Sequence, residues 1–201
     1  MLKALQRGLQ WLFMRVEAVF NAAFGDRLNP LYHLGAISFF LFWVIAATGL
    51  YLYAFFETGV ADAYTSVEGL THGQWFAGGV MRSVHRYASD GFVITMLIHI
   101  AQYTIIAAFE WFDWLPGFGG TLMRNFIYPD SVNDRFFSLL AFMHIGISLV
   151  LLLLQWVHVQ RVPKARTNPP RPIMTSVIVT LLLLSALRPV LSQGGAADLG
   201  V

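Results

Sequence analysis

Three apolar stretches of this sequence are each long enough to cross a lipid bilayer, which limits the chain to membrane architectures. They cover residues 34–56, 84–109 and 136–159. A helix that rises about 1.5 Å per residue needs about 20 apolar residues to cross about 30 Å of hydrocarbon. Residues 173–191 are a shorter fourth candidate, interrupted near its end by Arg188 and Pro189. Because no alternation of the β-barrel kind is visible, we predict an all-α integral membrane four-helix bundle.

The amino-acid composition agrees with a membrane setting. Of the 201 residues, 57% are hydrophobic and 12% are charged, more apolar than a water-soluble core of this size requires. The chain has no cysteine, which excludes disulfides, cysteine-ligated iron–sulfur clusters and the C-x-x-C-H attachment of a c-type haem. A net charge of +2 without a clustered aromatic and basic surface gives no reason to expect nucleic-acid binding.

The segment before the first span has a different pattern. Apolar residues recur there at helical spacing: Leu2, Leu5, Leu9, Leu12, Val16, Phe20 and Phe24. This pattern is typical of a helix in the membrane interface, with a helix packed on a partner subunit as the alternative; its charges disfavour a signal peptide or a fifth span. We predict an amphipathic interfacial helix at 1–30, a membrane domain at 31–192 and a tail at 193–201. Polar connectors are predicted at 57–82, 110–135 and 160–172.

Four histidines lie within the second and third predicted spans, in two pairs with the same spacing. His85 and His99 are fourteen positions apart, and so are His144 and His158. At about 100° per residue, fourteen residues return to within about 40° of the starting direction and rise about 21 Å. Two facing helices then offer one imidazole each at two depths, which is the arrangement needed to hold two haems between pairs of histidines.

Hydrogen bonding between helices and the binding of zinc or copper fit these histidines less well. A single histidine in a span can simply hydrogen-bond to a neighbouring helix. Four with a repeated interval on a consistent face are hard to reconcile with that role, because each unpaired polar ring in lipid is destabilising. Zinc or copper would need its ligands within a few ångströms of one centre. The sequence therefore favours bis-histidine haem ligation.

Two glycines and two arginines are further candidates for haem contact. Gly35 and Gly49 of the first span are also fourteen apart, so a flat macrocycle could lie close to the backbone at two heights; ordinary helix packing is the alternative. Arg82 and Arg86 flank the first histidine and could pair with haem propionates. Because Arg86 could instead pair with Asp90 one helical turn later, we prefer Arg82.

Several segments resemble the cytochrome b family of quinol-oxidising bc and bf complexes. The first two helices of that family are similar to LGAISFFLFWVIAATGLYLYAFF, ADAYTSV and GGVMRSVHRYASDGFVITMLIHI. The part that leads into and through its fourth helix is similar to LPGFGGTL, SVNDRFFSLLAFMHIG and QWVHVQRVPKARTNPP. The resemblance covers about residues 30–170. It implies that the four histidines are the axial ligands of two b-type haems, that is, of two iron protoporphyrin IX groups.

The sequence departs from that family between the two ligand helices. The family has a complete helix there, followed by quinol-site elements, whereas only residues 110–135 intervene here. Consecutive ligand helices should then run antiparallel, pairing His85 with His158 and His99 with His144. The parallel order of the family would instead pair His85 with His144 and His99 with His158. Spacing alone leaves both pairings open.

The basic residues raise a conflict about topology. They cluster before the first span and after the third: Lys3, Arg7, Arg15 and Arg27, and Arg161, Lys164, Arg166 and Arg171. The positive-inside rule places both clusters in the cytoplasm, which three crossings between them forbid. Either one basic cluster lies outside the cytoplasm, or residues 110–135 cross the membrane sheltered by protein. We favour the antiparallel bundle, with a cytoplasmic amino terminus and the acidic first connector outside.

Two haems at two depths predict an electron path across the membrane. The favoured function is an electron-transfer subunit between the quinone/quinol pool and a partner: an iron–sulfur protein, a c-type cytochrome or a second cytochrome b-like subunit. The expected location is the bacterial cytoplasmic membrane. No catalytic residue is assigned, because the proline–glutamate–tryptophan–tyrosine motif of the family is absent. The chain is therefore expected to be a subunit of an oxidoreductase complex rather than a complete enzyme.

Two alternatives to this function remain. One is a dihaem membrane anchor of a hydrogenase, formate dehydrogenase or nitrate reductase, and the other is a haem-free scaffold whose histidines only join helices. His33 and His72 lie near span ends and could transfer protons to quinone. Interfacial hydrogen bonding is the better interpretation of these two histidines.

Overall fold

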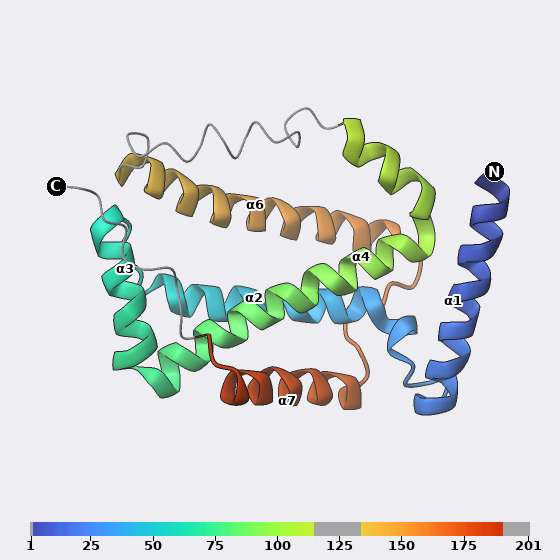
Figure 1. Ribbon diagram of the computed structural model, residues 1–201, viewed down its shortest axis with the longest axis horizontal. Helices are drawn as coiled ribbons and strands as arrows, with labels where there is room; N and C mark the ends of the chain where they lie inside the picture. The colour runs from blue at the N-terminus through green and yellow to red at the C-terminus, as the bar shows by residue number, and fades with distance from the viewer. Residues whose placement is uncertain (1, 115–133, 191–201) are drawn as a thin grey trace.

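The computed structural model describes residues 2–114 and 134–190, and every regular element in them is helical (Figure 1). The helices are α1 (Leu2–Phe24), α2 (Leu34–Tyr53), α3 (Val60–Glu68), α4 (Val80–Trp114), α6 (Asp134–Arg161) and α7 (Arg171–Leu187). A 3₁₀ turn at Pro30–His33 leads into α2, and two π-helical turns at Gly69–Gly73 and Trp75–Gly79 connect α3 with α4. The prediction of an all-α bundle is confirmed for the described residues.

Helices occupy all four predicted spans. The stretches Pro30–Tyr53 and Ser138–Arg161 are long and apolar enough to cross a membrane by length and composition. α7 is a shorter apolar helix with Pro172 in its first turn, where the missing N–H would have no intrahelical partner. It ends at Leu187, before the Arg188–Pro189 pair that interrupts the apolar run. α7 therefore ends four residues before the predicted boundary at 191, at the interruption that the sequence itself contains.

The connector after α2 contains a helix that its polar composition did not predict. α3 and the two π-helical turns lie within residues 57–82, where the sequence predicts only a polar connector. Asp62 lies in the first turn of α3, where its charge is favourable for the helix dipole. The buried Thr71 accepts a hydrogen bond of 2.7 Å from Arg82 at the start of α4. This contact between segments orders the connector, and a local sequence window does not show it.

The buried core lies between α2, α4 and α7. It consists of Ile37, Leu41, Val84, Ala88, Ile173 and Leu181. The Ser38 hydroxyl donates to Thr95 Oγ1 at 2.9 Å and so joins α2 to α4. The Val190 N–H donates to Ser83 Oγ at 3.0 Å, which fixes the end of α7 beside the start of α4. α7 therefore runs antiparallel to α4, on the opposite side of α2 and α4 from α6 (Figure 1).

α1 lies across the direction of the bundle helices, beside the start of α2 (Figure 1). The fully buried Asn29 joins the two segments, because its Nδ2 donates to Asn21 Oδ1 at 2.6 Å and its Oδ1 accepts the Leu31 N–H at 2.9 Å. Large apolar side chains of α1 remain exposed, among them Trp11 and Met14. An exposed apolar face fits the predicted interfacial helix, and that placement stays a prediction.

α6 runs parallel to α4, so the antiparallel order that we favoured from the sequence is wrong. The ring of His85 lies nearest that of His144, and the ring of His99 lies nearest that of His158. The antiparallel order rested on the expectation that residues 110–135, which form no span, would not cross the bilayer as irregular backbone and would therefore join adjacent helix ends. Residues 115–133, outside the described part, could reach about 60 Å if extended, and α6 is only about 42 Å long. Connector length therefore does not require antiparallel helices.

The parallel order also removes the conflict between the two basic clusters. His99 lies against Gly35 near the start of α2 and opposite His158 near the end of α6. Pro172 of α7 lines the same cavity as Leu28, just before α2. The amino-terminal cluster and the connector between α6 and α7 thus lie at one end of the bundle. Both can then obey the positive-inside rule.

Candidate functional site

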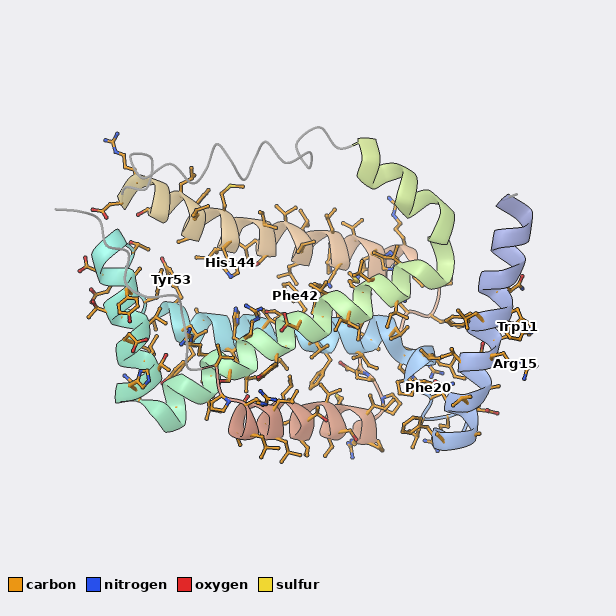
Figure 2. The ribbon with its side chains drawn as sticks, in the orientation of Figure 1. Trp11, Arg15, Phe20, Phe42, Tyr53 and His144 are labelled. Carbon is orange, nitrogen blue, oxygen red and sulfur yellow. The ribbon has the colours of Figure 1, made fainter. Side chains whose placement is uncertain are left out.

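The four histidines meet in two pairs across the space between α4 and α6. Ring centroids are 6.3 Å apart for His85 and His144, and 6.4 Å apart for His99 and His158. Figure 2 shows His144 on the side of α6 that faces α2 and α4. Two imidazoles that bind one metal from opposite sides have ring centres about 6 Å apart, because each metal–nitrogen bond is about 2 Å long. Each pair therefore has the separation that one shared metal ion requires.

The two pairs are separate centres. Fourteen residues along either helix correspond to about 21 Å, so no single ion can contact both pairs. Among the described residues, no three His, Cys, Asp or Glu side chains gather into a metal site. Each centre thus offers two protein ligands, on opposite sides. A metal bound there needs its remaining ligands from another group, and a porphyrin supplies four in one plane.

Two glycines of α2 lie against the histidines of α4. A Cβ added at Gly49 would lie 3.0 Å from Cε1 of His85, and one added at Gly35 would lie 3.2 Å from Cε1 of His99. Any larger residue would push against these rings. The glycines predicted from their spacing therefore lie at the two histidine levels, where α2 touches the rings directly. Contact between the glycines and a macrocycle stays a prediction.

The outer nitrogen of His85 has hydrogen-bond partners on α2. Its Nδ1 lies 3.2 Å from the Ile45 carbonyl oxygen and 3.1 Å from Thr48 Oγ1. The Thr48 hydroxyl donates to the Val44 carbonyl at 2.7 Å, so the Nδ1–H can donate to Ile45. Nε2 is then the nitrogen left for a metal, and metal-binding histidines usually carry such a second bond. Sequence reasoning missed Thr48, although it directly precedes Gly49 in an apolar run.

The two candidate arginines have different surroundings. Arg86 is exposed and forms an ion pair of 3.3 Å with Asp90, which confirms the local pairing considered from their spacing. Arg82 donates to Thr71 and, among the described residues, forms no ion pair with a carboxylate. Its role toward a propionate stays a prediction.

The remaining two histidines have the hydrogen bonds expected for them. His33 is buried, and its Nε2 lies 3.0 Å from the Arg27 carbonyl oxygen. His72 is exposed, and its Nδ1 lies 2.8 Å from a carboxylate oxygen of Glu68. His33 thus has the expected hydrogen bond and His72 contacts Glu68, whereas the position of both residues at the membrane interface stays a prediction. Neither belongs to the paired centres between α4 and α6.

Comparison with known proteins gives a consistent result. A family model described as cytochrome b/b6/petB matches residues 19–127. Curated cytochrome b6 proteins from Tupiella akineta, Porphyra purpurea and Synechococcus sp. (strain CC9902) are 34%, 32% and 32% identical to this chain over 83 residues. The aligned part covers 41% of this chain and 38% of each relative, so the chain matches about two fifths of their length. No solved structure matches this chain.

The family match and the geometry complement each other. The matched residues 19–127 include both glycines and both histidines of the α2–α4 pair. The histidines of α6 lie outside the match, and the fold places each of them opposite a histidine of α4. Since the match covers more than half of this chain, the chain belongs to the cytochrome b family, whose members are membrane proteins that bind haem b.

Proposed function

We propose that this chain is a membrane-embedded dihaem b-type cytochrome subunit that carries electrons across the membrane. The observation that carries the proposal is the pair of facing histidine centres, with ring separations of 6.3 and 6.4 Å. Bound haem supplies reversible one-electron redox chemistry. Because the two levels differ by about 21 Å along the helices, the two haems would lie near opposite membrane faces.

The packing of α6 also supports a flat group between the ligand helices. α4 packs closely against α2 and α7, whereas α6 packs closely against no other described helix. α6 lacks close packing contacts, yet its histidines face those of α4. A macrocycle between the two helices explains this arrangement better than direct helix packing does. In this proposal, His85 and His144 hold one haem, and His99 and His158 hold the other.

Residues around the ligands have supporting roles in the proposal. Ile45 and Thr48 orient the His85 ring through Nδ1, which leaves Nε2 for iron. Gly49 gives that ring its space against α2. Arg82, three residues before His85, is the proposed partner of a haem propionate, and a guanidinium suits that carboxylate.

The proposed setting is a bacterial cytoplasmic membrane with the chain crossing it several times. The end of the bundle with both basic clusters would face the cytoplasm, in agreement with the positive-inside rule. Quinone or quinol is the proposed electron carrier at one end. An iron–sulfur protein, a c-type cytochrome or a second cytochrome b-like subunit is proposed at the other.

The direct test is the visible spectrum and haem content of the purified chain. We expect two b haems per chain, with the sharp reduced bands of bis-histidine haem and reduction by a quinol analogue. A colourless protein without iron would contradict the haem proposal. If both haems are present but no quinol analogue reduces them, the haem assignment would stand and the quinone assignment would be rejected.

Gly49→Ala is expected to disturb only the haem of the His85–His144 pair. The new Cβ would lie 3.0 Å from the His85 ring, so the ring must move away from its position. Haem content should fall from two toward one per chain, measured by extraction and spectrum. Alanine favours helix by about 1 kcal/mol over glycine, so helix weakening is not the cause.

The matched control for this change is Gly146→Ala on α6. A Cβ at Gly146 meets nothing within 4 Å, so this variant should keep both haems. Equal haem loss in the two variants would show that the contact between Gly49 and His85 is not the reason.

A further inference from the structure

One polar side chain of α6 is buried although most of that helix is exposed. Gln155 has a relative exposure of 9%, whereas its neighbour Leu154 has 57%. Among the described residues, the Gln155 Oε1 atom is buried and has no hydrogen-bond partner. Nearly all buried polar groups in proteins are hydrogen-bonded, and an unpaired one is destabilising. The carbonyl oxygen of Gln155 therefore calls for a partner beyond the described protein atoms.

The helix geometry of α6 places this side chain on the face that carries the haem ligands. Gln155 follows His144 by eleven residues, which returns to within about 20° of the same direction. It precedes His158 by three residues, or about 4.5 Å along the axis. Since His144 points toward α2 and α4 (Figure 2), Gln155 lies on the inner side of α6, at the level of the His99–His158 pair.

The position of Gln155 in the sequence also favours a specific role. It directly follows the apolar run at 149–154 within a predicted membrane span. A polar residue inside a span is costly, faces the interior of the bundle and commonly marks a functional site. A leucine at this position would fit the run without leaving a polar atom unpaired.

We propose that Gln155 is a positioning residue for the haem of the His99–His158 pair and that its carbonyl oxygen lowers the potential of that haem. The inference rests on the proposed function. The negative end of the amide dipole stabilises the more positive ferric state.

The test is an optical redox titration of the purified holoprotein with Gln155→Leu, Gln155→Glu and Gln160→Leu. In Gln155→Leu we expect two haems per chain, one reduction step moved to higher potential and the other unchanged. Gln155→Glu retains an acceptor oxygen, so its step should stay at or below the parent potential. Gln160→Leu makes the same chemical change at an exposed position of the same helix and should move neither step.

The outcomes separate this inference from the haem proposal. Two haems with both potentials unchanged in Gln155→Leu would overturn the role of Gln155, as would an equal shift of both steps. If Gln155→Leu does not keep both haems, Gln155→Ala takes its place with the same expectation. A parent protein without haem would reject the proposed function itself.

Discussion

The double variant His85→Leu/His144→Leu is expected to keep one haem per chain, whereas His85→Leu/His158→Leu should keep none. The first removes both ligands of one centre, and the second removes one ligand from each. A haem left with a single histidine ligand is no longer held from both sides between α4 and α6. Haem extracted per chain and the number of reduction steps give the measurement.

The opposite result would restore the antiparallel order. If His85 paired with His158, that double variant would keep one haem and His85→Leu/His144→Leu would keep none. The single variants His99→Leu and His144→Leu should each remove one haem under either pairing, and unchanged haem content in them would count against the ligand assignment. His72→Leu is the control, because this histidine is exposed and bonded to Glu68 outside the centres.

A membrane-impermeant thiol reagent is expected to label Arg166→Cys and Asp26→Cys from one side and Glu57→Cys from the other. All three positions are exposed, and the chain has no cysteine of its own, so each variant has a single reactive thiol. The parallel order of α4 and α6 places the first two positions at one end of the bundle. Glu57 follows α2 at the other end. Labelling of intact cells and of inverted vesicles should give an all-or-none pattern.

Labelling can contradict this topology in a defined way. If Arg166→Cys reacted from the side of Glu57→Cys, α6 would run antiparallel to α4. The histidine double variants would then have to give the opposite haem contents as well. Agreement of the two experiments, which use different residues and different chemistry, would establish the direction of α6.

Much of the fold follows from local sequence rules. Apolar runs of sufficient length located the helices of all four spans, and the Arg188–Pro189 interruption matches the end of α7. The ion pair of Arg86 with Asp90 was readable because residues four apart on a helix are neighbours. α3 was missed, because its surroundings include a contact between Thr71 and Arg82 that composition does not reveal.

The candidate site, like the fold, could be predicted from the sequence only in part. Helix periodicity fixes the direction and height of each side chain on its own helix, so the histidine and glycine spacings could be read as two levels. The support of His85 by Ile45, and the burial of Gln155, depend on which neighbouring helix lies against each face. That information is absent from the spacing.

The sequence by itself determined that the chain is helical and apolar, and that it carries two imidazoles on each of two helices at two heights. Only the tertiary structure decided that His85 faces His144 and that His99 faces His158. The physical reason is that helical periodicity relates residues within one helix and carries no information about the direction of the next helix. Direction depends on the packing of whole helices, and here it also brings the two basic clusters to one end.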